Sequence, residues 1–145
     1  MTPIKLRREH LLDLAKLEQE LFSSDAWSVE ALAFLLTDRA TARCVEEDGR
    51  AVAYGGMLYA PDEGQILNLG VDKNYRRRGY AQAILASLEQ DARAHGAKAL
   101  FLEVRASNLP AIRLYEKVGF STVGRRPAFY RAPIEDAILM QKELD

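Results

Sequence analysis

The stretch that decides how the chain is organised is Asn68-Leu69-Gly70-Val71-Asp72-Lys73-Asn74-Tyr75-Arg76-Arg77-Arg78-Gly79-Tyr80-Ala81-Gln82. It begins as an apolar strand, continues through a polar turn with three arginines, and ends at a glycine and the start of a helix. The first N–H groups of a helix have no intrahelical acceptor, and the helix dipole there favours negative charge. Gly79 has no Cβ and can adopt positive φ, so a ligand can approach the backbone closely. The stretch therefore predicts an anion site with arginine charge suited to phosphate.

The common phosphate-binding motifs are absent from this sequence, because it contains neither GxxxxGK[ST] nor GxGxxG. The pattern that fits is [Q/R]-x-x-G-x-[G/A], which here is Arg76-x-x-Gly79-x-Ala81 directly after a predicted strand. Three arginines alone fit a solvated basic turn before a helix equally well. The rest of the chain must decide between a ligand site and such a turn.

Length and composition predict one globular domain over residues 1–145. The net charge is −1, so the arginine cluster is local, and direct nucleic-acid binding is not expected. Apolar runs stay short of the ~18 residues of a membrane span, and the charged N-terminus lacks a signal-peptide core. We therefore expect a cytoplasmic protein without membrane contact.

Neither a disulfide nor a metal cofactor is expected. Cys44 is the one cysteine, and the apolar alternation around it predicts a buried thiol rather than a nucleophile. The two histidines, His10 and His95, are far apart in sequence and both lie near predicted helix ends.

The hydrophobic periodicity predicts an α/β (α+β) fold with a mixed, mostly antiparallel sheet of about seven strands flanked by about four helices. A longer connection with aromatic residues is expected at residues 125–131. Strands are expected at residues 4–7, 41–46, 51–59, 65–71, 99–102, 120–124 and 134–142, and helices at residues 10–22, 29–36, from Gly79 to about residue 95, and 109–117.

Glu103 is the most informative candidate for chemistry. The run Ala99 to Leu102 is apolar without alternation, which is typical of a strand buried on both faces. A carboxylate at the end of such a strand is costly to desolvate, and its position suits a general base. The alternative is that Glu103 already lies at the rim and pairs with Arg105 or Arg113.

Two further polar residues follow Glu103. Tyr115 on the next predicted helix is a candidate acid, although a half-buried structural tyrosine is the ordinary interpretation. Asn108 is expected to cap that helix, a role compatible with a ligand contact.

These residues stand in a run that resembles the GNAT family of N-acetyltransferases, and Arg76-x-x-Gly79-x-Ala81 resembles its coenzyme A pyrophosphate loop. Within the family, the chain is most similar to the RimI-type enzymes, which acetylate the N-terminal alanine of a ribosomal protein. The run is Phe101-Leu102-Glu103-Val104-Arg105-Ala106-Ser107-Asn108-x-x-Ala111-Ile112-x-Leu114-Tyr115-Glu116-x-x-Gly119-Phe120. The pair Trp27-Ser28 and the ending Glu135-Asp136-Ala137-x-x-Met140 also match that subgroup.

The resemblance implies a direct transfer from acetyl-CoA, in which Glu103 takes a proton from the amine and Tyr115 returns one to the leaving thiolate. It implies that acetyl-CoA is held by Leu69, Gly70, Val71, Arg76, Arg77, Arg78, Gly79, Tyr80, Ala81, Gln82 and Asn108. The subgroup often has proline before the tryptophan, where this chain has Ala26, and many members have glycine where it has Ala81. The first departure leaves the shape of the acceptor groove open.

The aromatic residues Trp27, Phe129 and Tyr130 are candidates for the walls of an acceptor site. Trp27 is otherwise expected to fix the angle between the first two helices, as a hydrophobic staple before the Ser28 cap.

The expected function is acetylation of a protein N-terminal α-amine, with a ribosomal protein as the expected partner. A lysine ε-amine or a small-molecule amine is an alternative acceptor, and a non-catalytic module that binds coenzyme A is the alternative from another class. The sequence leaves the oligomeric state open.

Overall fold

A seven-stranded sheet in the order β1-β2-β3-β4-β5-β7-β6 is the centre of the computed structural model, which describes residues 2–145. Neighbouring strands are antiparallel except β4 and β5, which pair in parallel. The mixed, mostly antiparallel sheet predicted from the sequence is thus confirmed. The strands are β1 (Ile4–Lys5), β2 (Ala40–Glu47), β3 (Arg50–Ala60), β4 (Glu63–Val71), β5 (Ala99–Arg105), β6 (Ser121–Arg131) and β7 (Ile134–Glu143).

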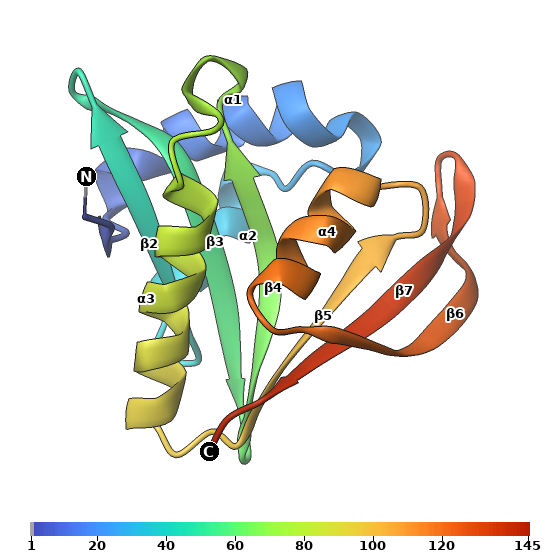
Figure 1. Cartoon of the computed structure of the whole chain (residues 1–145). Coiled ribbons are helices and arrows are strands. Elements are labelled where there is room, and N and C mark those ends of the chain that lie inside the picture. The colour runs from blue at the N-terminus through green and yellow to red at the C-terminus, as the bar shows by residue number, and fades with distance from the viewer. Residues whose placement is uncertain (1) are drawn as a thin grey trace.

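The helices cover both faces of the sheet (Figure 1). Helices α1 (Leu11–Phe22) and α2 (Val29–Ala33) pack on one face, where they share an apolar core with Tyr54 and Cys44. Helices α3 (Tyr80–Ala94) and α4 (Leu109–Lys117) pack on the other face. Four short 3₁₀ turns complete the chain: η1 (Arg8–His10), η2 (Ser23–Asp25), η3 (Phe34–Leu36) and η4 (Lys73–Tyr75).

Local sequence signals account for several element boundaries. Asp48 and Gly49 both have positive φ, 52° and 79°, as a tight hairpin turn between β2 and β3 requires. The Ser28 hydroxyl accepts the Ala31 N–H at 3.1 Å and caps α2. The Asn108 side chain accepts the Ala111 N–H at 3.3 Å and caps α4. These turn and cap predictions are confirmed.

The parallel pairing of β4 and β5 is short, and this determines where a ligand can enter. Only three residue pairs join the strands, from Glu63–Ala99 to Gln65–Phe101. Beyond them β4 continues beside β3 and β5 beside β7, and the β3–β4 register shifts between Gly56 and Met57. Figure 1 shows the two strands diverging, with α4 lying over the space between them. One edge of β4 therefore has no strand partner beyond Gln65.

The structure corrects one expected connection. Residues 125–131 were expected to connect two strands, but they continue β6 as part of a long hairpin with β7. Pairing is interrupted between Arg126 and Tyr130, where Ala128 has a φ of 52° and donates its N–H to Asp136 at 2.9 Å. Pro127 is compatible with this position because β6 is an edge strand. Phe129 and Tyr130 thus lie on β6, an edge strand of the sheet, and not on a connecting loop.

Two other expectations need adjustment. The helix expected over residues 29–36 is α2 followed by the separate 3₁₀ turn η3. Strand β5 is not buried on both faces along its length, because its outer residues Phe101, Glu103 and Arg105 are only partly buried. These residues alternate with buried ones along the strand, so one face of β5 is covered and the other is only partly covered. No helix in the part of the chain that the structure describes is long and apolar enough to cross a membrane.

Candidate active site

Two adjoining cavities lie where β4 and β5 diverge. The first, of about 480 Å³, contains the loop that connects β4 to α3, and we call it the loop cavity. The second, of about 210 Å³, is lined by the carboxylates of Glu18, Asp25 and Glu103, and we call it the carboxylate cavity. Residues that line both cavities mark their junction: Phe22, Leu69, Asn108, Ala111 and Tyr115. A molecule held in the first cavity can therefore extend toward the second.

The loop before α3 has the backbone conformation of an anion site. Gly79 precedes the helix with a φ of 80°, and Arg77 also has positive φ, at 65°. The Gly79 carbonyl accepts the Ala83 N–H at 3.0 Å, so the preceding N–H groups of the first turn have no helical acceptor. Backbone turns of this kind direct successive N–H groups toward one point and bind anions. Among the described residues, the charged side chains that line the loop cavity are both cationic, Arg76 and Arg77.

Asp72 anchors the start of this loop. Its carboxylate accepts the Asn74 N–H at 2.9 Å and lies 3.2 Å from the Arg50 guanidinium. The hydrogen bond from Asn74, helped by Arg50, lowers the pKa of Asp72. Asp72 therefore remains ionised at neutral pH and fixes the turn from which the arginines project.

Gly70 is a glycine for a different reason from Gly79. A Cβ at residue 70 would lie 2.6 Å from the Tyr54 hydroxyl, whereas a Cβ at residue 79 would meet nothing within 4 Å. Gly70 therefore lets β4 pass over a buried tyrosine ring, and Gly79 supplies a backbone conformation.

Nearly all residues predicted to hold acetyl-CoA are brought together by the fold. Arg78 does not line the loop cavity, and its guanidinium instead lies over the Tyr75 ring at 4.9 Å. The predicted residues that do line it are Leu69, Gly70, Val71, Arg76, Arg77, Gly79, Tyr80, Ala81, Gln82 and Asn108.

Glu103 lies on β5 just beyond the point where β4 separates from it. Its side chain is 19% exposed, and Oε2 lies 3.4 Å from Arg126 Nε. That contact lacks hydrogen-bond geometry, so Oε2 is buried without a hydrogen-bond partner among the described residues. The alternative, in which Glu103 pairs with Arg105 or Arg113, is not found, because the cation beside Glu103 is Arg126, on β6. A carboxylate oxygen with no hydrogen bond is available to accept a proton.

Tyr115 lies on α4 at the junction of the two cavities. The ring is buried and packs edge-on against Phe120. Burial, with a smaller effect of Tyr130, raises the pKa of Tyr115 well above its usual value. The hydroxyl thus keeps its proton over the physiological range and can donate it.

The three aromatic candidates differ in position. Trp27 and Tyr130 line the carboxylate cavity, and Trp27 also packs against the core that α1 and α2 share. Its role as a hydrophobic staple remains a prediction. Burial and then the charge of Glu103 raise the pKa of Tyr130 to about 12. Phe129 lines neither cavity, is 43% exposed, and packs edge-on against Tyr130.

Four polar residues of the carboxylate cavity were not predicted as site residues: Glu18, Asp25, Asn68 and Arg105. Glu18 is 1% exposed, and its carboxylate accepts the Trp27 N–H at 2.9 Å and the Tyr54 hydroxyl at 2.5 Å. A signal for Glu18 existed, because it lies four residues after Leu14 and so falls on the apolar face of α1. Asp25 follows α1 in a polar turn and carries no comparable signal.

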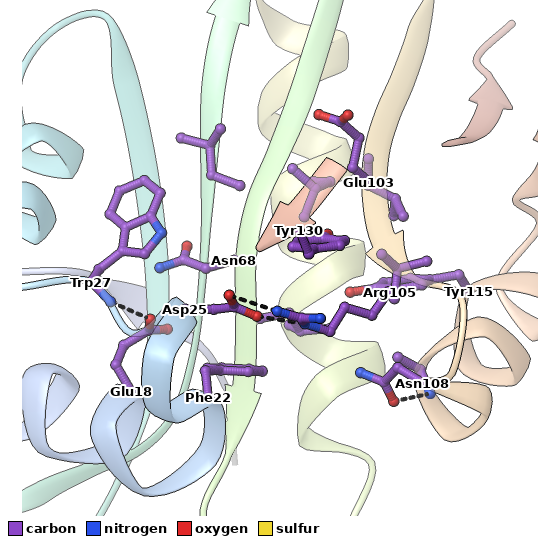
Figure 2. A pocket seen from close by; sticks show the side chains of 16 residues that line it. Glu18, Phe22, Asp25, Trp27, Asn68, Glu103, Arg105, Asn108, Tyr115 and Tyr130 are labelled. Atoms are coloured by element: carbon purple, nitrogen blue, oxygen red, sulfur yellow. Dashed lines mark hydrogen bonds and ion pairs between the residues drawn. The ribbon is translucent and has the colours of Figure 1, made fainter. Parts of the chain in front are cut away.

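Figure 2 shows how these residues are arranged. Glu18 and Trp27 lie on one side, Asn108 and Tyr115 lie on the other, and the Asp25–Arg105 pair lies between them. No three His, Cys, Asp or Glu side chains within residues 2–145 are grouped as a metal ion would require. The expectation of a metal-free reaction remains a prediction.

Comparison with known proteins agrees with this geometry. The model of the acetyltransferase (GNAT) family matches residues 8–120. The [ribosomal protein bS18]-alanine N-acetyltransferase of Escherichia coli K12 is 34% identical over 116 residues, which cover 79% of this chain and 78% of that protein. A putative enzyme of the same name from Bacillus subtilis is 30% identical over 137 residues, covering 93% of this chain and 90% of that protein.

Solved structures show the same fold. The crystal structure of the ribosomal-protein-S18-alanine N-acetyltransferase from Escherichia coli has a TM-score of 0.89 and 31% identity, covering 99% of this chain and 94% of that chain. An aminoglycoside 6'-N-acetyltransferase complexed with coenzyme A has a TM-score of 0.86 at 16% identity, covering 99% and 97%. The latter likeness concerns the fold alone. By sequence and by fold, the chain belongs to the acetyltransferase (GNAT) family and is an N-acetyltransferase.

Proposed function

We propose that this chain transfers an acetyl group from acetyl-CoA to the N-terminal α-amine of a protein, with the N-terminal alanine of a small-subunit ribosomal protein as the expected acceptor. The single observation that carries the proposal is the junction of the two cavities. A cationic loop with an anion-binding backbone lies on one side, and a glutamate oxygen without a hydrogen bond lies on the other. The names of the relatives from Escherichia coli and Bacillus subtilis support the choice of acceptor.

The loop cavity fits acetyl-CoA in charge and in shape. Arg76, Arg77 and the backbone before α3 suit the diphosphate. The unpartnered edge of β4 at Leu69 to Val71 presents N–H and C=O groups to the amide-containing arm, as it would to another strand. Asn108 and Tyr115 lie at the end of the cavity that meets Glu103. When bound, acetyl-CoA supplies an acetyl group activated as a thioester.

Glu103 serves as the general base in this proposal. An amine must be neutral to attack, and the buried Oε2 has no hydrogen bond that would compete for the proton. An α-amine has a pKa of about 7.7–8.0, against about 10.4 for a lysine side chain. The free-energy cost of removing a proton from lysine at neutral pH is therefore higher by roughly 3.4 kcal/mol. This difference favours an N-terminal acceptor for a single carboxylate base.

Tyr115 serves as the general acid. Its raised pKa keeps the hydroxyl protonated, and its position at the junction lets it deliver a proton to the sulfur that leaves. A backbone N–H near Val71, on the unpartnered edge of β4, is available to polarise the acetyl carbonyl. Donor and acceptor are bound together, so no acyl-enzyme on Cys44 is required, and that thiol is fully buried.

The test is incubation with acetyl-CoA and lysine-free peptides that begin with Ala, Ser or Met, beside an N-terminally blocked peptide with one internal lysine. We expect mass spectrometry to find the acetyl group on the first residue of the Ala peptide and none on the blocked peptide. Acetylation of the internal lysine alone, or of a small amine alone, would replace the proposed acceptor. Absence of thiol release with every acceptor would favour the non-catalytic module that binds coenzyme A.

The proposed location is the cytoplasm, where acetyl-CoA and newly made protein N-termini are both present. Fractionation of cells that express the tagged chain would test this directly.

A further inference from the structure

Arg105 at the end of β5 connects two segments that are far apart in sequence. Its Nε lies 2.7 Å from Asp25 Oδ2, and its Nη2 lies 3.0 Å from Asp25 Oδ1. On the other side, Nη1 donates to Glu135 Oε1 and to the Pro133 carbonyl, both at 3.0 Å. Nη2 also reaches the Ala132 carbonyl at 3.4 Å. All five N–H donors of the guanidinium are thereby used.

The two connected segments are the η2 turn after α1 and the tip of the β6–β7 hairpin. A second hydrogen bond joins them directly, from the Ser24 hydroxyl to the Ala132 carbonyl at 2.6 Å. The Tyr130 ring lies against the Arg105 guanidinium at 4.4 Å. We call the Asp25–Arg105 pair, with its contacts to the hairpin, the Arg105 tie.

The Arg105 tie lies within the carboxylate cavity rather than beside it. Asp25, Arg105 and Tyr130 all line that cavity, and the pair crosses the middle of Figure 2. Trp27, on the opposite wall, follows Asp25 by two residues. Any change in the position of Asp25 therefore moves the Trp27 wall relative to the Tyr130 wall.

The contacts of the Arg105 guanidinium are more specific than is needed to stabilise the β6–β7 hairpin. The side chain of Arg105 is only 16% exposed, and partly buried ion pairs give little net stability because both charges lose water. A lysine could not replace the guanidinium, because its single ammonium cannot bind Asp25 through two parallel hydrogen bonds while reaching two carbonyls. The planar guanidinium of Arg105 therefore fixes the distance between the η2 turn and the tip of the β6–β7 hairpin.

We propose that Arg105 is a positioning residue that sets the width of the acceptor site and so selects acceptors with a small first side chain. This inference rests on the proposed function, because it takes the carboxylate cavity as the acceptor site. Arg105 does not line the loop cavity, so it lies away from the acetyl-CoA side. Its effect should therefore fall on acceptor binding and acceptor choice.

The experiment uses Arg105→Lys, with Arg125→Lys as the matched control. Arg125 also pairs with an acid, Asp136 at 2.6 Å, but it lies on the outer part of β6 and lines neither cavity. The acceptors are two lysine-free hexapeptides that differ only in their first residue, Ala or Leu. For Arg105→Lys we expect the KM of the Ala peptide to rise about tenfold and the preference for Ala over Leu in kcat/KM to fall about tenfold. The KM of acetyl-CoA should stay within about twofold, and Arg125→Lys should change neither value.

A structural role would look different. Equal changes in kcat and both KM values, or the same loss of preference with Arg125→Lys, would overturn the inference. If Arg105→Lys does not fold, Asp25→Asn removes the charge from the other end of the tie and keeps the shape of the side chain. It should likewise raise the KM of the Ala peptide and lower the preference for Ala, with the KM of acetyl-CoA nearly unchanged. Hydrogen exchange should then speed up at residues 24–27 and 130–132, and not at residues 76–82. Unchanged exchange at both connected segments would also contradict the tie.

The outcomes separate this inference from the proposed function. If the wild type acetylates only a lysine or a small amine, the proposed acceptor is wrong. The inference about Arg105 is then tested by comparing the KM of the accepted amine between Arg105→Lys and the wild type. If the wild type acetylates the Ala peptide while Arg105→Lys keeps the full preference for Ala, the proposed function holds and the tie fails.

Discussion

The loop cavity and the carboxylate cavity adjoin each other but are built in opposite ways. The loop cavity takes most of its lining from one continuous stretch, residues 69–82, and its charged side chains are two arginines. The carboxylate cavity draws on α1, the η2 turn, β4, β5, α4 and β6, and three of its four charged side chains are acidic. One site is a local motif, and the other is a product of the whole fold.

This difference separates two tasks. A motif that is complete in sequence can bind a constant ligand, because the backbone of a single turn supplies most of the contacts. A cavity whose walls come from six segments can change its acceptor when any one segment moves. We therefore expect substitutions in the loop cavity to affect binding of acetyl-CoA, and substitutions in the carboxylate cavity to affect catalysis and acceptor choice.

The sharpest test of this division is Glu103→Gln. The variant keeps the shape of the side chain but cannot take a proton, so we expect kcat to fall by about 10²–10⁴-fold. The KM of acetyl-CoA should be nearly unchanged, because Glu103 does not line the loop cavity. Thiol release at saturating concentrations of both substrates measures the effect.

The control for that variant is Glu116→Gln, which removes an exposed carboxylate from α4 outside both cavities. Its rate should equal that of the wild type, and both proteins should melt at similar temperatures. A Glu103→Gln enzyme with full kcat would remove Glu103 from the role of base.

The same contrast explains what the sequence could and could not predict. The strand, turn and helix around Gly79 are specified by neighbouring residues, so the sequence predicts the part of the loop cavity that they form. It does not predict the lining that α1 and α4 add, such as Phe22 and Leu114. Glu103 was found because a carboxylate in an apolar strand is conspicuous. Its neighbour Arg126 was not found, because residues 125–131 lack the alternation of a strand and their pairing depends on β7.

Contacts between distant segments were outside the reach of sequence patterns. The Asp25–Arg105 pair joins residues 80 positions apart, and neither residue breaks a local pattern. The sequence predicts Phe129 and Tyr130 together because both are aromatic, but successive residues of a strand face opposite sides. Only the register of β6 decides which ring faces the cavity.

Tyr115→Phe tests the junction between the two cavities. Loss of the hydroxyl removes the proton donor, so we expect kcat to fall by about 10²-fold with little change in either KM. Because burial raises the pKa of Tyr115, the wild-type rate should not decline through ionisation of this group as the pH rises from 7 to about 10. A pH–rate profile of both proteins checks this, since a decline between pH 7 and about 10 that is lost in Tyr115→Phe would show that the pKa of Tyr115 is not raised. A full kcat in Tyr115→Phe would remove Tyr115 from the role of acid.

Gly79→Ala and Gly70→Ala compare two glycines of the loop cavity. At residue 79 the new methyl group meets no atoms, so the cost is the positive φ, about 1–2 kcal/mol, and the KM of acetyl-CoA should rise. At residue 70 the methyl group would overlap the buried Tyr54 ring, and we expect a loss of about 1–3 kcal/mol in the free energy of unfolding.

Urea unfolding and acetyl-CoA titration of the two glycine variants separate these effects. Overpacking at residue 70 should affect stability more, and the change at residue 79 should affect the KM of acetyl-CoA more. The reverse order would show that the Gly79 turn is not the anion site.

The smallest expected effect concerns Glu18, the buried acid that holds Trp27 in place. Burial raises its pKa, against the opposing hydrogen bonds from Tyr54 and Trp27. Below its unfolded pKa of about 4.3 the carboxyl is protonated in both states, and as the pH rises through the higher folded pKa its contribution to stability is lost. In Glu18→Gln this pH dependence is absent, so the stability of the wild type relative to the variant should decrease as the pH rises above about 4.3.

Asp136→Asn supplies a control of opposite sign for the Glu18 measurement. The Ala128 N–H and then Arg125 lower the pKa of Asp136, so its contribution is present above the unfolded pKa and is lost as the pH falls. The stability of the wild type relative to this variant should therefore increase from about pH 3 to pH 5. Urea unfolding from about pH 3 to neutral pH measures both differences. Two curves with the same slope would show that Glu18 is not held as a buried acid, and the wall that carries Trp27 would then need another support.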